Sequence, residues 1–328
     1  DDDEQTDRVK EMDNKLLDEI IACLPQDRTL FRYARNDYAL MLLSRYVGKG
    51  MKITDLRRSP FGKLLEKPAI RNLMADIGSG CVSGDVFDYV YVKDRQDFLL
   101  TVGRWNEGKS RHNQTTRNSA NLVLQLNFNS GHDQAFERFV DRDDAWYFGN
   151  YGHPVLKKGE RSYYRNTMAW IRMDVEFDTN EVLIEEVQND WLRDAHDWLK
   201  DKQSEVKDAK SEQVKKRLLL AISEYMEKIL AHYYRLWDEA ALSAAINFII
   251  DELGIREIYY HTFDTGNVLK GMWNSHPPRS LYTDLPRKFC FELTDEVPRM
   301  FSRSTAAKRK LRKVVDPHWY RLDMEAQQ

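Results

Sequence analysis

The sequence predicts an α/β fold in which an N-terminal helical region precedes a mixed, mainly antiparallel sheet. Three observations carry this prediction. Apolar residues recur at helical spacing in KLLDEIIACL and YALMLLSRYV. Strand-like apolar runs follow in DFLLTVGRW and NLVLQLNF. Finally, the apolar helix pattern ALSAAINFIIDELG stands between two strand patterns, which is the order of a β-α-β crossover.

Composition narrows the class of protein. The 328 residues are 42% hydrophobic and 12% aromatic, which is typical of a folded chain of one or two domains. A formal net charge of -3 does not indicate a nucleic-acid partner. No apolar run approaches the ~20 residues of a membrane span, and the acidic start DDDEQTDRVKEMD lacks a signal-type core. Three widely spaced cysteines favour a cytoplasmic location over a disulfide framework.

Changes in pattern along the chain divide it into two regions. Helical patterns fill residues 1–78, and the small residues of IGSG end that region. We expect residues 79–328 to form the α/β domain. Its first strand is predicted within DVFDYVYV, residues 85–92, where apolar residues alternate. A charged helical stretch at about 191–236 is predicted to be an insertion in the crossover.

The clearest local element is a β-hairpin, MAWIRMDVEF-DTN-EVLIEEVQND. Its strands are expected near 168–177 and 181–190. If the three-residue turn pairs the two strands symmetrically, Val175 lies opposite Leu183. The buried face is then expected to consist of Ile171, Val175, Leu183 and Val187.

The other face of the hairpin collects polar side chains at the end of its second strand. The same register places Arg172 opposite Glu186 and Trp170 opposite Gln188, and Asp190 follows directly before a helix. Open α/β folds bind ligands where strands end and helices begin, so we predict a site here. Its catalytic residues are Glu186, Gln188, Asp190 and Arg172, with Glu186 as general base and Gln188 orienting the substrate.

The same residues also have a purely structural interpretation. Arg172 and Glu186 then form a cross-strand ion pair, and Asp190 caps the helix that starts at Trp191. The density of polar groups in an otherwise apolar strand favours a site. Both interpretations stay open on the sequence alone.

The hairpin resembles a known element. MAWIRMDVEF followed by VLIEEVQNDW is similar to the IEEIQSDW-type strand–helix motif of an uncharacterised bacterial and phage family. The motif also occurs in large polyvalent proteins of phages and mobile elements, where a helix leading into a strand follows; Ala241, Ile246 and residues 248–259 fit that pattern. Asn189 departs from the usual Ser, and the helical insertion is longer. The resemblance covers about residues 165–265 and implies no established reaction.

A weaker resemblance is to the GNAT acyltransferases. Two antiparallel strands, a helix, a strand and then SLYTDLPRKFCFEL are similar to their cofactor-binding half. The likeness implies an acyl-CoA bound where strands separate, with its pyrophosphate on N–H groups at a helix N-terminus. The glycine-rich loop expected before that helix is missing, and HYYRLWDEAAL stands there. The residues assigned to cofactor binding are Tyr282, Arg279, His261 and Trp170.

YYHTFDTG provides a third resemblance, to the strand of ADP-ribosyltransferases that carries His and Tyr. It implies that His261 holds a nicotinamide ribose and that Glu185 or Glu186 is the catalytic carboxylate. HExxH, CxxC, P-loop, GxGxxG and GxSxG motifs are missing from the sequence, so no metal site is assigned. The basic residues within 308–313 are interpreted as an exposed helix end or a local phosphate contact.

These observations predict a transferase that acts on a small molecule or nucleotide, with GNAT-like acyl transfer as its most specific version. An ADP-ribosyltransferase-like enzyme is one alternative. The rival from another class is a non-catalytic factor of phage–host conflict that binds protein or nucleic acid. Oligomeric state is not indicated by the sequence.

Overall fold

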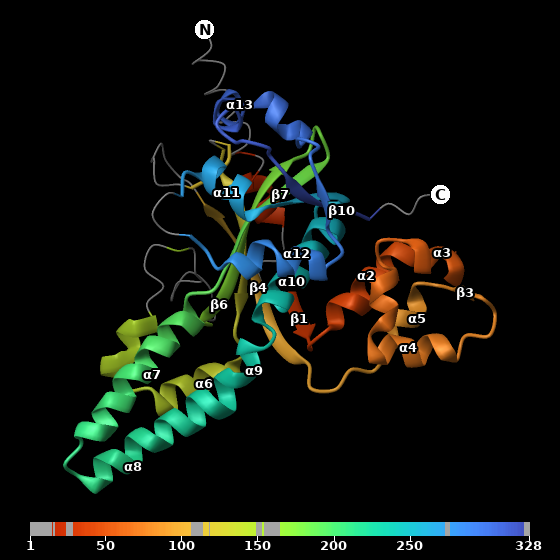
Figure 1. The fold of residues 1–328 in the computed structure, drawn as a ribbon. Coiled ribbons are helices and arrows are strands. Elements are labelled where there is room, and N and C mark those ends of the chain that lie inside the picture. The colour runs from red at the N-terminus through yellow and green to blue at the C-terminus, as the bar shows by residue number, and fades with distance from the viewer. Residues whose placement is uncertain are drawn as a thin grey trace.

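An eight-stranded sheet forms the centre of the computed structural model, which describes residues 15, 17–23, 29–105, 114–117, 119–148, 153, 165–272 and 276–324 (Figure 1). Its strands are β1 (Thr29–Tyr33), β4 (Gln96–Trp105), β5 (Asn121–Asn127), β6 (Thr167–Glu176), β7 (Glu181–Gln188), β8 (Glu257–His261), β9 (Glu292–Thr294) and β10 (Trp319–Asp323). They lie in the order β1-β4-β5-β6-β7-β8-β10-β9. Among the described strands of this sheet, β7 and β8 alone pair in parallel, and the other neighbours are antiparallel. The predicted mixed, mainly antiparallel sheet is confirmed.

The crossover between the parallel strands is α10 (Trp237–Asp251). Ten of its fifteen residues are buried, because it is apolar on nearly every side and packs on β6 and β7. Gly254 follows the helix with a φ of 71°, a conformation that glycine adopts without a Cβ clash. The predictions of a buried helix and of a following strand in the same sheet are confirmed.

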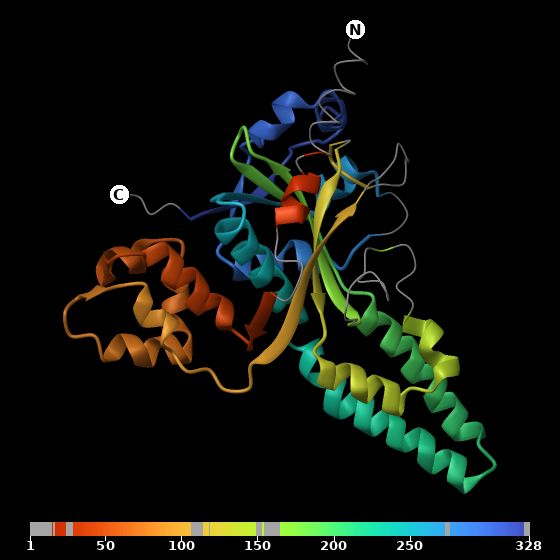
Figure 2. The same cartoon turned by 180° about the vertical axis from the view of Figure 1, so that it is seen from behind.

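A helical arm interrupts this crossover, as predicted. It consists of α7 (Trp191–Asp208), α8 (Glu212–Ala221), a π-helical segment (Ile222–Leu230) and α9 (Ala231–Tyr234). The arm extends away from the sheet, with α6 (Ser130–Phe139) beside it (Figures 1 and 2). Trp191 Nε1 donates to Tyr225 Oη over 2.9 Å within a cluster of aromatic rings, which ties the base of the arm together.

The N-terminal lobe is made of short helices beside the sheet. These are α2 (Asp37–Val47), α3 (Ile53–Arg58), α4 (Pro68–Ala75) and α5 (Asp85–Asp88), with a small two-stranded sheet of β2 (Met51–Lys52) and β3 (Cys81–Val82). Arg45 on α2 joins the lobe to α10 through ion pairs to Asp251, the shortest of them 2.6 Å, and hydrogen bonds to Asn247. The domain boundary at 78–79 stays a prediction, although β1 from the first region pairs with β4.

Two local predictions were wrong in this part of the chain. Residues 29–33 form the strand β1, which the helical pattern of the region did not indicate. Residues 85–92 contain the short helix α5 instead of a strand. Phe87 is buried against the lobe whereas Tyr89 and Tyr91 are exposed, so a brief alternation of apolar residues arises here without any strand partner.

The sheet separates a large core from a small one. The face against α10 belongs to the large core. The opposite face of β7, β8 and β10 is covered by α11 (Phe263–Lys270), by residues 299–303 and by α13 (Thr305–Leu311). The small core consists of Leu183, Tyr259, Leu269, Met300, Phe301, Ala307 and Trp319. None of the described helices is both long enough and apolar enough to span a membrane.

A glycine in the N-terminal lobe provides a test of its packing. A Cβ on Gly84 would lie 2.2 Å from the Ser44 carbonyl oxygen and 2.9 Å from that of Gly48, and both are backbone atoms. Gly84→Ala is therefore expected to destabilise the protein by about 1–3 kcal/mol in urea denaturation. Gly78→Ala is the matched control, because a Cβ there meets nothing within 4 Å, and its effect should stay below about 0.5 kcal/mol. Equal effects of the two substitutions would contradict this packing.

Candidate functional site

A β-bulge in β7 determines how the candidate site is built. Arg172 pairs with Glu186, but the next residue of β6, Met173, pairs with Ile184, so Glu185 is one extra residue in β7. The predicted pairs of Arg172 with Glu186 and of Trp170 with Gln188 are confirmed. The predicted pair of Val175 with Leu183 is wrong.

The bulge also changes which side chains share a face. Beyond it, Val182 and Ile184 join Val187 in the large core, while Leu183 lies in the small core on the other side. Ile171, Leu183 and Val187 are buried as predicted, but they do not form one face. Val175 is only partly buried. Strict alternation would need equal residue counts on both strands, which the extra residue prevents.

Arg172 and Glu186 form a shielded ion pair. Arg172 Nη2 donates to Glu186 Oε2 over 2.8 Å and to the carbonyl oxygen of Gln114 over 2.7 Å. The two side chains are 3% and 10% exposed, so the pair is largely removed from water and is not the solvated surface pair of the structural interpretation. Trp105 lies under the guanidinium, 5.3 Å from ring centroid to Cζ.

Next to this pair, Asp190 binds a histidine that sequence reasoning missed. Asp190 accepts a hydrogen bond from His153 Nδ1. It also forms an ion pair with Arg193, in which Nη2 lies 2.6 Å from Asp190 Oδ1. Gln188 Nε2 donates to the same carboxylate over 3.2 Å. Burial alone would raise the pKa of Asp190, but the hydrogen bond and charge of His153 and the charge of Arg193 lower it below its ordinary value.

The histidine ring lies against two indoles. His153 is 4.7 Å from Trp170 and 6.1 Å from Trp105 between ring centroids. A cavity of about 20 Å³ is lined by Trp105, Gln114, Val123, His153, Trp170, Arg172, Glu186 and Gln188. This volume holds about one water molecule. We call this set, together with Asp190, the β7-end site.

The helix after β7 is capped differently from the prediction. Asp190 makes no side-chain capping hydrogen bond, whereas Asn189 Oδ1 accepts from the Leu192 N–H over 2.8 Å. Asn189 thus satisfies a free N–H of the first turn of α7. Asp190 is released from capping, and its carboxylate turns instead toward His153 and Gln188.

A short segment covers the bulge. Residues 114–117 lie over β6 and β7, and we call them the strap. Thr116 donates from N and Oγ1 to Glu185, at 2.7 and 2.9 Å. Arg117 forms a bidentate pair with Asp174, 2.7 and 2.8 Å long, and Lys310 of α13 donates to the carbonyl oxygens of Thr115 and Thr116. Buried charges therefore hold the strap in place.

Glu185 also joins β7 to the end of β8. His261 Nε2 lies 3.0 Å from Glu185 Oε2, and both side chains are fully buried. Burial lowers the pKa of His261, the hydrogen bond and charge of Glu185 oppose this shift, and Nε2 donates to the carboxylate. Burial opposes ionisation of Glu185, but the hydrogen bonds and the surrounding positive charges bring its pKa to about 2.

The parallel strands separate just before the bulge. Their recorded pairs end at Ile184 and Tyr260, and the end of β7 continues without β8. Lys270 of α11 reaches this gap and donates to the Glu185 carbonyl oxygen over 2.9 Å and to Tyr282 Oη over 3.1 Å. Burial lowers the pKa of Lys270.

The four residues assigned to cofactor binding are not brought together. Trp170 belongs to the β7-end site. His261 is buried beneath the strap, and Tyr282 is buried against Lys270. Arg279 is exposed and pairs with Asp264 at 3.5 Å. The gap where an acyl-CoA would lie is occupied by Lys270 and Tyr282, so these residues do not fit that cofactor.

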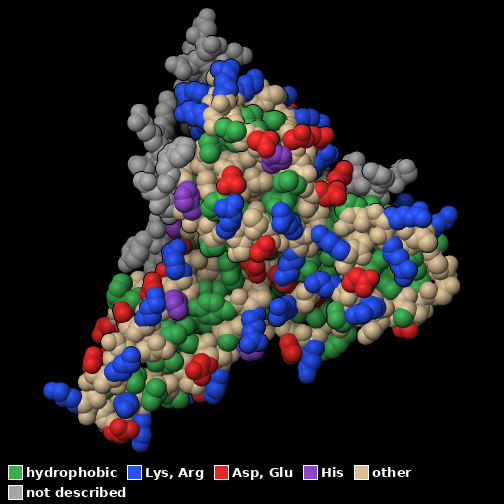
Figure 3. All heavy atoms as spheres, in the orientation of Figure 1, with side chains coloured by type: hydrophobic (Ala, Val, Ile, Leu, Met, Phe, Trp, Pro, Cys, Tyr) green, Lys and Arg blue, Asp and Glu red, His purple; other side chains and the backbone are tan. Residues whose placement is uncertain are grey.

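The basic segment 308–313 is divided between two roles. Figure 3 shows Lys and Arg side chains gathered over α13. Lys308, Arg309, Arg312 and Lys313 are exposed, whereas Lys310 holds the strap. Within the described residues, no group of three or more His, Cys, Asp or Glu side chains is placed to bind a metal ion.

Comparisons of the chain with protein-family models, with curated proteins and with solved structures found no match.

The Glu185 network gives a test by pH. Because the folded-state pKa of Glu185 is about 2 against an ordinary 4.5, its ionised form stabilises the fold above pH 4.5, and this contribution is lost as the pH falls toward 2. Glu185→Gln should cost about 3 kcal/mol at pH 7 by urea denaturation. The difference from the native protein should shrink between pH 5 and pH 3.

Thr116→Ser is the control, because it keeps both donors to Glu185 and should cost less than about 1 kcal/mol. A difference between Glu185→Gln and the native protein that stays constant from pH 7 to pH 3 would contradict the assignment of an ionised Glu185.

Proposed function

We propose that the protein is an enzyme that transfers a group to or from a small molecule, using the β7-end site for acid–base chemistry. The observation that carries this proposal is the meeting of two side-chain pairs, His153 with Asp190 and Arg172 with Glu186, around one cavity. A paired histidine and a fixed carboxylate beside aromatic walls are the parts that proton transfer requires.

The His153 pair sets the direction of proton transfer. Since Asp190 accepts from Nδ1, Nε2 is the ring atom that remains to exchange a proton with a substrate. Asp190 also stabilises the imidazolium that forms when Nε2 takes a proton. Gln188 is held by the same carboxylate, which fixes its amide and prepares its oxygen to accept from a substrate N–H or O–H.

The Arg172 pair prepares a second proton acceptor. Arg172 donates to one oxygen of Glu186 and thereby fixes the orientation of the carboxylate. Its position on the cavity wall lets it orient or deprotonate a substrate hydroxyl or amine. Trp105 and Trp170 limit the water around both groups.

The arrangement of strands supports the transferase class. An antiparallel hairpin, a crossover helix and a parallel strand that separates at its end are what the GNAT resemblance implies. Because the gap is filled, no step here involves acyl-CoA, and the group donor stays open. Membership in the phage and bacterial family with the IEEIQSDW-type motif also stays a proposal, supported by the strand–helix form of residues 181–208.

A second candidate is a non-catalytic binding factor. The volume of about 20 Å³ at the β7-end site favours it, since most small molecules need far more room. The ADP-ribosyltransferase alternative is weaker, because His261 is fully buried and its ring is engaged by Glu185 and Thr116.

The central test is Glu186→Gln. Native mass spectrometry of the purified protein first identifies a co-purified small molecule, and its turnover is then followed by mass spectrometry. The variant should lower turnover by roughly 10²–10⁴, because an amide cannot accept the proton. It should also cost about 1–3 kcal/mol of stability, since Arg172 loses a buried charged partner.

Asp174→Asn is the matched control. Asp174 lies on β6 in another buried ion pair, with Arg117, and does not line the cavity. It should lose a similar amount of stability and keep turnover. Full turnover by Glu186→Gln, or an equal loss of turnover in both variants, would contradict the proposal that this site is catalytic. If native mass spectrometry finds no small molecule bound to the purified protein, the result favours the non-catalytic binding factor.

A further inference from the structure

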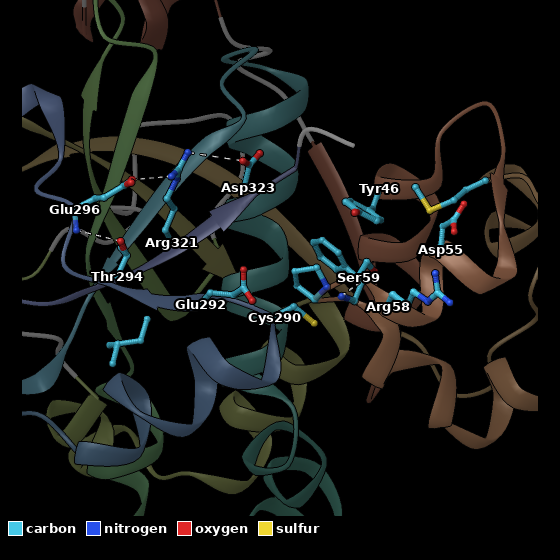
Figure 4. A pocket seen from close by; sticks show the side chains of 14 residues that line it. Tyr46, Asp55, Arg58, Ser59, Cys290, Glu292, Thr294, Glu296, Arg321 and Asp323 are labelled. Carbon is cyan, nitrogen blue, oxygen red and sulfur yellow. Dashed lines mark hydrogen bonds and ion pairs between the residues drawn. The ribbon is translucent and has the colours of Figure 1, made fainter. Parts of the chain in front are cut away.

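A second hollow shares no lining residue with the β7-end site. It is a groove of about 630 Å³ between the N-terminal lobe and the strands β9 and β10 (Figure 4). Its volume is within the range of ligand-binding pockets. The lobe contributes Tyr46, Met51, Asp55, Arg58, Ser59, Pro60 and Phe61, and the sheet contributes Cys290, Glu292, Leu293, Thr294, Glu296, Arg321 and Asp323.

The charges of the groove do not balance. Four carboxylates and two guanidiniums line it, which leaves two negative charges. Arg321 is occupied by Glu296 at 2.8 Å, by Glu257 at 3.1 Å and by Asp323 at 3.7 Å. Among the described residues, Asp55 and Arg58 on the wall of the lobe and Glu292 on the wall of the sheet form no ion pair. The excess negative charge therefore lies mainly on the wall of the sheet, and Asp55 faces it from the lobe beside Arg58.

The groove also runs past the edge of the sheet. Three consecutive residues of β9 line it, and β9 is the last strand in the order, paired only with β10 among the described strands. Its other edge carries backbone N–H and C=O groups free to pair with an added strand. Leu293 is 56% exposed there.

An aromatic pair forms the wall beside Asp55. The rings of Tyr46 and Phe61 are 4.3 Å apart between centroids. The two side chains are 8% and 1% exposed, so they form a packed wall behind the groove. The charge of the groove and the free edge of β9 together describe one kind of ligand.

We propose that this groove binds an extended peptide segment with basic side chains from a partner protein. The segment pairs its backbone with the edge of β9 and places a lysine or arginine between Asp55 and Glu292. Main-chain hydrogen bonds supply general affinity, and the two carboxylates select positive charge. The proposal is independent of the reaction at the β7-end site.

The test uses a fluorescein-labelled octapeptide that alternates lysine and threonine, with fluorescence anisotropy as the readout. The full protein should bind it, and should not bind the peptide in which glutamate replaces lysine. The double variant Asp55→Asn with Glu292→Gln should bind about tenfold more weakly. Asp197→Asn with Glu227→Gln is the control, because both residues are exposed on the arm and the net charge changes equally.

Two further measurements distinguish binding of a peptide in the groove from non-specific attraction of cations. An octapeptide with N-methylated backbone amides should bind several-fold more weakly, because it cannot donate to the edge of β9. Spermine should compete poorly, since it lacks a backbone. Equal weakening by both double variants, or equal binding of the methylated peptide, would overturn the proposal. Thermal melting of each variant verifies that it is folded.

Discussion

One extra residue in β7 determines the arrangement of this half of the sheet. In a strand without the bulge, Glu185 and Glu186 would point to opposite faces, and one of them would enter the large core. With it, both carboxylates lie on the face beneath the strap, where each meets a different cation or donor: Arg172 for Glu186, Thr116 and His261 for Glu185. The parallel pairing with β8 also ends at this point. A single insertion therefore creates the carboxylate pair, the separation of the strands and the space that Lys270 fills.

The charges that result are compatible with burial only because they neutralise one another. Arg172 and Arg117 donate to the carboxylates of Glu186 and Asp174, Thr116 donates to that of Glu185, and Lys270 donates to the backbone carbonyl of Glu185. Two apolar faces can shift against each other at little cost. In a buried network of charged groups, by contrast, one arrangement gives every group its hydrogen-bond partners. The strap is thereby fixed over the sheet by backbone groups that accept from Arg172 and Lys310. Most of the buried charged residues on this face therefore stabilise the fold. The β7-end site is the part of the face that lines the small cavity.

Parts of this arrangement follow from the sequence, and the reasons for the rest are physical. The pairs of Trp170 and Arg172 were predicted correctly because two departures of one residue cancel: the turn has four residues, 177–180, instead of three, and β7 has one extra residue at the bulge. The pair of Val175 and Leu183 lies between the turn and the bulge, so only the longer turn affects it, and no glycine in DTN indicates that length. Asn189 and Asp190 are equally good caps by residue type, and only the structure distinguishes them. His153 lies 37 residues from Asp190, and no local spacing links them. The strand β1 was missed because tertiary pairing, not local pattern, defines it.

The cavity of the β7-end site and the groove at β9 differ greatly in size, which suits them to different roles. The β7-end site has room for about one water molecule, whereas the groove at β9 is many times larger and lies across the parallel strands from it. Residues that line the groove come from 46–61 and from 290–323, so the sequence gives no local indication of it. Neither hollow is lined by α10, but the helix connects the elements around them, since it packs on β6 and β7 and is joined to α2 of the lobe by Arg45. The crossover helix therefore attaches the lobe, which forms one wall of the groove, to the strands that carry the β7-end site.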